Sequence, residues 1–329
     1  LDFPALHITG WFDWDQPGAM FYWRGMAEHS PAADHQYLVA GPWTHPQTWA
    51  GGQTSLGEWS FTESSVADVK PIHLAFFDRY LKGTTDALPF PRARLYVTGE
   101  DRWRDFGAYP PAASRVQRLY VHSGGEANAS MTDGVLDWTE PGDEPPDRYV
   151  HDPNDPVPST TGGDSRGIDH RPIGERDDVL VYTSEPLEDT LVVIGNVFVT
   201  LHAATDARDT DWVVKVLDVH PDGRSLKIGP TEVGVLRARY REGYEETVLL
   251  EPGQVEEYRI EHFDVAHAFL PGHRIRLQVA SAAFPFIDVN TNTGNPARTD
   301  TEWVIAHQTV YHDRLRPSFV ELPVLERDR

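Results

Sequence analysis

The 329-residue sequence contains no cysteine, which excludes disulfide bonds, thiolate-bound zinc and a cysteine nucleophile. Positive charge is scarce, since 29 Lys and Arg residues stand against 51 Asp and Glu residues. The formal net charge of -22 would repel a phosphate backbone or an anionic membrane surface, so we expect neither nucleic acid nor a membrane as a partner. Long apolar runs are also missing, and none approaches the roughly 20 residues that a membrane-spanning helix needs.

The abundant residue types indicate many turns between short, aromatic-rich elements. Hydrophobic residues make up 40 % of the chain, which is enough to give two domains a core each. The 26 Gly, 26 Pro and 10 Trp residues favour short strands and argue against an all-helical bundle.

The first third of the chain alternates apolar strands with helical stretches, which is typical of a parallel sheet covered by helices. We predict strands over residues 5–9, 36–40 and 94–98, and helices over residues 17–29 and 71–81. The chain starts with Leu rather than Met, and no turn or helix precedes the first strand. Because a parallel strand in that position needs neighbours, we expect part of this domain to lie upstream.

The remainder of the chain, from about residue 111, consists of short β-branched runs separated by Pro, Gly and Asp, which predicts an all-β domain. Residues 133–176 are dense in Pro, Gly, Asp and Glu and are expected to form a long ordered loop or connector. A two-sheet sandwich or jelly roll is the most economical arrangement. The expected strands cover residues 191–203, 212–219, 247–250, 275–280 and 304–311.

Two titratable residues stand in tight turns directly after predicted parallel strands. The segment GWFDWD at 10–15 carries Asp13, and GPWTHP at 41–46 carries His45. Open α/β sheets place catalytic groups at the carboxyl ends of their strands, and a carboxylate on one imidazole nitrogen leaves the other free to deprotonate a serine. Asp13 and His45 are therefore candidate members of a catalytic triad. On spacing alone, an Asx turn and an ordinary structural histidine remain the alternatives.

No metal or cofactor is expected. The 15 His residues are scattered and include no His-Glu-x-x-His helix. Asp-rich runs at 152–155 and 206–211 lack the glycine and the closing glutamate of a hand-type calcium loop, so acidic turns are the simpler interpretation.

The two motifs resemble the acid and histidine motifs of the cocaine-esterase-like and X-Pro dipeptidyl-peptidase group of serine hydrolases. The resemblance runs from about residue 5 to residue 324. It implies an incomplete α/β-hydrolase core over residues 1–110, followed by a jelly-roll β-sandwich over residues 111–329. Other matching segments are FFDRYLKG at 76–83, RLYVTG at 94–99, WRD at 103–105, DPVPS at 155–159, LPGHRIRL at 270–277, and residues 281–294 and 317–323.

The resemblance also implies a reaction, the transfer of an acyl group from an ester or amide to water. Asp13 would be the triad acid and His45 the general base, but the G-x-S-x-G pentapeptide of the nucleophile is missing. Ser55, in QTSLG, lacks the first glycine and follows the histidine, which makes it a poor candidate. We therefore expect the serine on an amino-terminal segment or a separate chain. Esters, amides and Xaa-Pro peptides remain open as substrates.

Substrate contacts are expected close to these motifs. Relatives that hydrolyse α-amino acid esters have acidic residues two and three positions after the triad acid, where they bind an ammonium group. Here Asp15 matches and Gln16 does not, and a solvated turn carboxylate is the other interpretation of Asp15. Trp14 and Trp43 flank the motifs and either line an acyl pocket or belong to the core.

A second function of a different class fits the same composition. Jelly rolls occur in lectins as well as in enzymes, so the chain could instead be a non-catalytic module that binds a carbohydrate or a protein.

Overall fold

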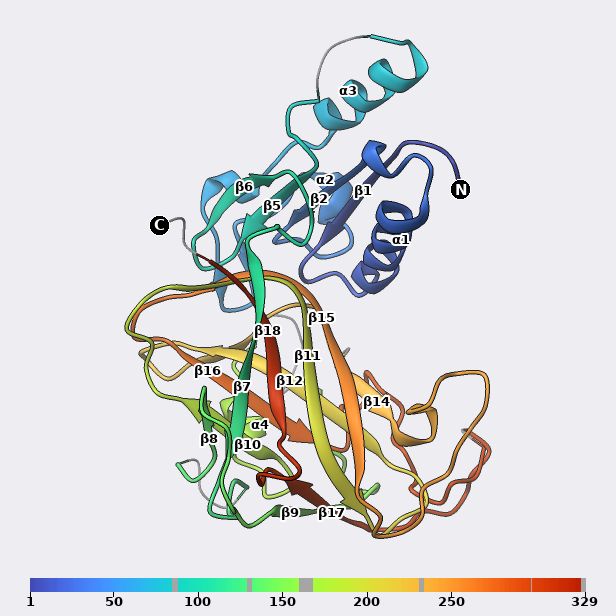
Figure 1. Cartoon of the computed structure of the whole chain (residues 1–329), viewed down its shortest axis with the longest axis vertical. Coiled ribbons are helices and arrows are strands. Elements are labelled where there is room, and N and C mark those ends of the chain that lie inside the picture. Colours follow the sequence, from blue (N-terminus) through green and yellow to red (C-terminus); the bar gives the residue numbers. More distant parts are fainter. Residues whose placement is uncertain (85–87, 129–131, 160–167, 231–233, 297, 327–329) are drawn as a thin grey trace.

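The computed structural model describes residues 1–329 except 85–87, 129–131, 160–167, 231–233, 297 and 327–329. The chain is mostly β-sheet with few helices: a small sheet with its helices comes first, and a larger β-sandwich follows (Figure 1). Within the described part of the chain, every helix is too short or too polar to cross a membrane.

The small sheet has four strands in the order β1-β2-β5-β6. Strands β1, β2 and β5 run parallel and β6 is antiparallel to β5. The three predicted strands and two predicted helices of this region are confirmed to within one or two residues at each end. The elements are β1 (Ala5–Gly10), α1 (Gln16–His29), η1 (Ala33–His35), β2 (Gln36–Gly41), α2 (Gln47–Ala50), β3 (Ser55–Leu56), β4 (Trp59–Ser60), η2 (Glu63–Ser65), α3 (Lys70–Leu81), β5 (Ala93–Val97) and β6 (Arg102–Phe106).

Strand β2 is buried on both faces because helices cover both sides of the sheet. Leu38 and Ala40 belong to a hydrophobic cluster that contains Met20 and Trp23 of α1. Tyr37 and Val39 point the other way, into a cluster with the buried side chains of α3. This continuous burial explains why β2 reads as an apolar run rather than as an alternating strand.

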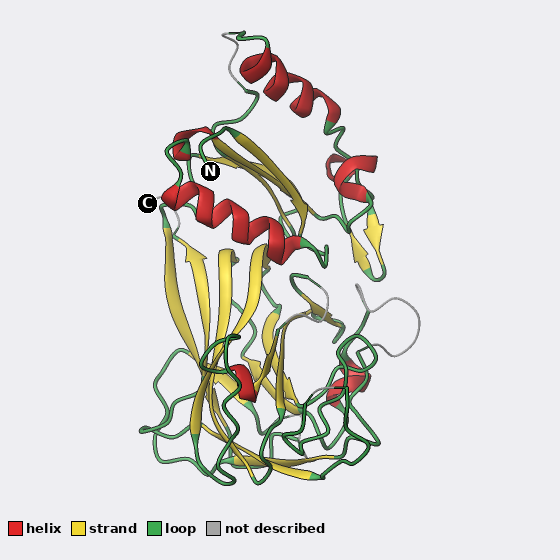
Figure 2. Ribbon diagram, turned by 90° about the vertical axis from the view of Figure 1, so that its right-hand side faces the viewer, coloured by secondary structure: helices red, strands yellow, loops and turns green. Residues whose placement is uncertain are grey.

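In the sandwich, the described strands form one hydrogen-bonded path in the order β13-β12-β16-β10-β8-β7-β18-β11-β17-β9, with β14 on β12 and β15 on β11. The path folds over a large hydrophobic cluster to which both layers contribute, and a smaller cluster around Val181 and Ala280 is separate from it (Figures 1 and 2). Its elements are β7 (Ser114–His122), β8 (Val135–Asp137), β9 (Asp147–His151), α4 (Arg171–Gly174), β10 (Leu180–Ser184), β11 (Leu191–Thr205), β12 (Asp211–Val219), β13 (Ser225–Lys227), β14 (Val235–Arg237), η3 (Ala238–Tyr240), β15 (Glu256–Phe269), β16 (Arg274–Ala280), β17 (Ala306–Tyr311) and β18 (Phe319–Leu325).

Two expectations for this region need correction, and several strands were not predicted, the longest of them being β15. Residues 247–250 are not a strand, because the N–H groups of Val248 and Leu250 donate to the Arg239 and Arg208 carbonyls instead of to a strand ladder. The predicted connector at 133–176 contains β8, β9 and α4, and part of it, 160–167, lies outside the described residues. Strand β15, which pairs with β11 along almost its whole length, was not predicted.

The small sheet and the sandwich share backbone hydrogen bonds. Just beyond β5, the Thr98 N–H donates to the Ala266 carbonyl at 3.0 Å, and the Ala268 N–H donates to the Thr98 carbonyl at 2.8 Å. Gly99 adopts a φ of +84°, and a Cβ there would lie 2.1 Å from the Ala268 carbonyl oxygen. Helix α1 also contacts β15, and Figure 2 shows it lying across the end of the sandwich. The two parts therefore form one packed body.

Candidate active site

The loops after β1 and β2 meet because the two strands are parallel neighbours that end at the same edge of the sheet. The Trp11 N–H donates to the Gly41 carbonyl at 2.9 Å, and the Phe12 N–H donates to the Trp43 carbonyl at 3.0 Å. Gly10 allows this approach, since a Cβ at that position would lie 2.1 Å from the Trp43 carbonyl oxygen. The backbone thus fixes both loops before any catalytic side chain is considered.

Asp13 and His45 lie within hydrogen-bond distance of each other. The His45 Nδ1 atom is 3.2 Å from both carboxylate oxygens of Asp13. Asp13 is buried and also accepts a hydrogen bond of 3.0 Å from the Asp15 backbone N–H, whereas 38 % of the His45 side chain is exposed. Because a carboxylate only accepts, Nδ1 carries the proton and donates. No hydrogen bond to His45 Nε2 is found among the described residues, so this nitrogen is free to accept.

Asp15 lies beside the same imidazole. Its Oδ2 atom is 3.2 Å from His45 Nδ1, and 63 % of its side chain is exposed. The Trp49 ring meets the imidazole edge-on at a centroid distance of 4.8 Å, and both Trp14 and Trp49 are largely exposed. Two carboxylates therefore face one imidazole nitrogen, one from inside the protein and one from the solvent side.

Trp43 does not belong to the accessible surface. Its side chain is fully buried and packs against Trp103 at a ring-centroid distance of 5.5 Å. Its indole N–H donates to the Ser65 carbonyl at 3.0 Å. This burial favours the alternative in which Trp43 belongs to the core rather than to an acyl pocket.

The described residues do not complete a triad at His45. Ser55 is exposed in the short strand β3 and makes no hydrogen bond to His45. A separate Ser, His and Asp group inside the sandwich has the wrong arrangement: the Ser123 hydroxyl donates to Asp147 at 2.7 Å, and His312 binds the same Asp147 oxygen at 3.0 Å. His312 is completely buried, so this group is a structural network rather than a nucleophile.

Two groups of side chains place their ligand atoms close enough to hold a cation. One is Asp13, Asp15 and His45, and the other is Asp218, His220 and His273 in the sandwich. The sequence analysis missed the second group, because Asp218 and His273 are 55 residues apart and only the spacing Asp-x-His at the end of β12 hints at it. Burial acts to raise the pKa of Asp218, but hydrogen bonds from His267 and His273 lower it to about 2, which keeps it ionised.

Comparison with known proteins finds similar sequences and folds among hydrolases. Residues 88–321 match the family described as the X-Pro dipeptidyl-peptidase C-terminal non-catalytic domain. The chain is 36 % identical to cocaine esterase of Rhodococcus sp. (strain MB1 Bresler), over 98 % of this chain and 57 % of the esterase. The region that matches the family begins after both Asp13 and His45.

Two solved structures are similar in fold. An aminopeptidase from a marine sediment Thaumarchaeota archaeon superposes with a TM-score of 0.84 and 31 % identity, over 99 % of this chain and 55 % of that one. An α-amino acid ester hydrolase gives a TM-score of 0.84 and 29 % identity, over 98 % and 56 % of the two chains. The chain thus spans a little over half the length of each of these three relatives.

Proposed function

This chain belongs to the X-Pro dipeptidyl-peptidase C-terminal domain family, and from that premise we propose that it is the carboxyl-terminal portion of a serine hydrolase acting on acyl esters or amides. In this proposal, residues 1–110 are part of an α/β-hydrolase core and residues 111–329 are a jelly-roll domain. The nucleophilic serine comes from an amino-terminal segment or chain, which is the required partner. The esterase and peptidase names of the relatives support this substrate range.

The observation that carries the proposal is the contact between a buried Asp13 and a half-exposed His45 with Nε2 unbonded. His45 would take the serine hydroxyl proton on Nε2 as the hydroxyl oxygen attacks the acyl carbon. It would return that proton to the leaving group when the tetrahedral intermediate collapses, and water would then repeat both steps to release the acid. Asp13 would stabilise the imidazolium and hold the tautomer in which Nδ1 is protonated.

Asp15 and Trp14 are the proposed substrate contacts of this chain. Both are exposed at the edge where His45 opens to solvent. The Asp15 carboxylate would attract the ammonium group of an α-amino acyl substrate, and the Trp14 ring would cover an apolar acyl group.

The test is hydrolysis of chromogenic esters and anilides by the full-length gene product that contains this chain. Asp13→Asn and His45→Ala should each lower kcat by several powers of ten, as removal of a triad member does. Asp15→Asn should raise KM for substrates with a free α-ammonium group and leave KM for N-acylated ones unchanged. Unchanged turnover in both Asp13→Asn and His45→Ala would refute the proposal.

A binding role for the sandwich is the competing proposal, and the description of the matched family as non-catalytic favours it. A glycan or peptide array probed with the same protein separates the two. Specific retention of a ligand, together with turnover that does not depend on His45, would support a binding module.

A further inference from the structure

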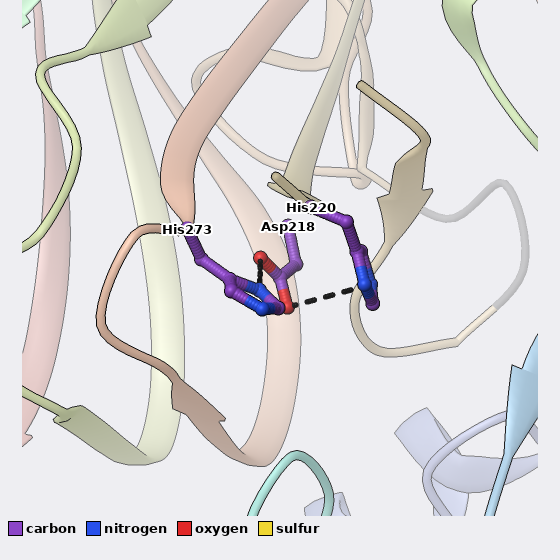
Figure 3. A group of neighbouring side chains, drawn as sticks. All are labelled: Asp218, His220 and His273. Carbon is purple, nitrogen blue, oxygen red and sulfur yellow. Dashed lines mark hydrogen bonds and ion pairs between the residues drawn. The ribbon is translucent and has the colours of Figure 1, made fainter. Parts of the chain in front are cut away.

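Asp218, His220 and His273 form a compact cluster on the side of the sandwich that faces the small sheet. Asp218 lies near the end of β12, His220 follows in the turn after that strand, and His273 stands just before β16 (Figure 3). The Asp218 Oδ1 atom is 2.8 Å from His273 Nδ1, and its Oδ2 atom is 3.8 Å from His220 Nε2. The two imidazole rings lie against each other with centroids 4.5 Å apart.

The position of His220 is not explained by hydrogen bonding. Its Nε2 atom is shielded from solvent and has no hydrogen-bond partner among the residues that the structure describes, although it points at the Asp218 carboxylate. At 3.8 Å the two atoms are too far apart for a hydrogen bond. Two ligands that share a tetrahedral metal at about 2.0 Å are separated by about 3.3 Å, so this spacing closes around a cation with only a small movement.

We propose that Asp218, His220 and His273 bind a divalent transition-metal ion, with Zn²⁺ as the best match. Two imidazole nitrogens and one carboxylate oxygen are ligands that zinc accepts, and a water molecule completes four-coordination. On binding, His273 adopts the tautomer protonated on Nε2, so that Nδ1 offers its lone pair to the metal. The oxygen-rich, flexible shell that Ca²⁺ requires is not provided by this set.

The surroundings hold these side chains in place. The His267 N–H at Nε2 donates to the Asp218 Oδ2 atom at 3.2 Å, while His267 Nδ1 lies 2.8 Å from the Thr98 hydroxyl. A carboxylate ligand oriented by such a hydrogen bond is typical of protein metal sites. The ring of Trp59, from the small sheet's side, packs edge-on against His220 at 5.9 Å. A neighbouring cavity of about 470 Å³ is lined in part by His220.

The bound ion would join three segments of the sandwich directly beneath the small sheet. It would tie the end of β12 and its following turn to the start of β16. Since Trp59 rests on His220 and Thr98 on His267, the ion would also stiffen the contact between the sandwich and residues 1–106. The site is therefore structural, and it does not depend on the proposed hydrolase activity.

The test measures Zn²⁺ binding to the full-length gene product by isothermal titration, with thermal unfolding as a second readout. The His45→Ala protein serves as the background, because His45 belongs to the other group that could hold a cation. We expect one Zn²⁺ per chain at this site and a rise in Tm of about 2–4 °C at a hundredfold excess over Kd. Ca²⁺ should produce no such rise.

Variants of the cluster decide the outcome. His220→Ala should weaken binding at least about 100-fold, and His220→Gln provides a second variant if the first does not fold. The matched control is His307→Ala, which removes an exposed histidine bonded to Asp206 at 2.7 Å elsewhere in the sandwich and should leave binding unchanged. Absence of saturable Zn²⁺ binding, or binding that survives both changes at His220, would overturn the proposal.

Discussion

The partly buried ion pair between α1 and β15 leads to a prediction about the free energy of unfolding. The buried Asp264 carboxylate accepts a 2.5 Å hydrogen bond from the Arg24 guanidinium and a 2.8 Å hydrogen bond from the Tyr109 hydroxyl. Replacement of Asp264 by Ala leaves the buried Tyr109 hydroxyl without a partner, at a cost of about 1–3 kcal/mol. Arg24 contributes at most about 1 kcal/mol, because 36 % of its side chain is exposed and Glu261 remains 3.4 Å away.

The expected total loss is about 3 kcal/mol in the free energy of unfolding, which corresponds to a decrease in Tm of about 4 °C for a chain of 329 residues. Asp264→Asn should lose only about 1 kcal/mol, since the amide oxygen still accepts from Tyr109. Calorimetric unfolding of the full-length gene product measures both differences.

A matched control separates burial from charge. Asp288 forms an ion pair of the same length, 2.5 Å, with Arg298, but both side chains are largely exposed. Asp288→Ala should therefore cost less than about 1 kcal/mol. If Asp264→Ala and Asp288→Ala lowered Tm equally, the argument from burial would be wrong.

Two further predictions concern buried positions. Burial lowers the pKa of His262 to about 3. Between pH 3 and about 6.5 the unfolded chain therefore binds a proton at this residue that the folded chain does not. The stabilisation that comes from keeping His262 neutral is fully present above about pH 6.5 and is lost as the pH falls. We expect the free energy of unfolding, measured in urea, to fall by about 2 kcal/mol less in His262→Gln than in the parent when the pH is lowered from 7 to 5. The same pH dependence in both proteins would contradict this. Gly10→Ala should destabilise the chain by about 1–3 kcal/mol, because its Cβ would lie 2.1 Å from a carbonyl oxygen. Gly18→Ala is the control and should not destabilise the chain, because the space around its Cβ is open. Equal effects of the two changes on Tm would refute the clash.

Local patterns predicted the small sheet well. The apolar runs at 5–9 and 36–40 and the helical spacing at 17–29 and 71–81 depend on neighbouring residues, which sequence shows directly. The Asp13–His45 contact followed from one more step, because parallel neighbouring strands end at the same edge.

The long strand β15 was missed because its pattern breaks. Tyr258 and Ile260 point inward between charged residues, but the register shifts between Val197 and Phe198 on the paired strand, and Phe263 adopts a φ of 77°. Such a bulge reverses the alternation of inward and outward positions halfway along the strand. The burial of Trp43 could not be predicted from the sequence either, because it depends on how separate segments of the chain pack together.

The backbone hydrogen bonds of Thr98 restrict which relatives could donate a β-sandwich domain to this chain. Strand β5 pairs with β2, whose end carries the His45 loop, and Thr98 extends β5 onto the backbone of Ala266 and Ala268. A chimera spliced near residue 111 would keep its own Thr98 but receive foreign partners for it. Only donors that present a carbonyl and an amide at the same two places would be compatible, so a graft should be chosen by that match rather than by overall sequence identity.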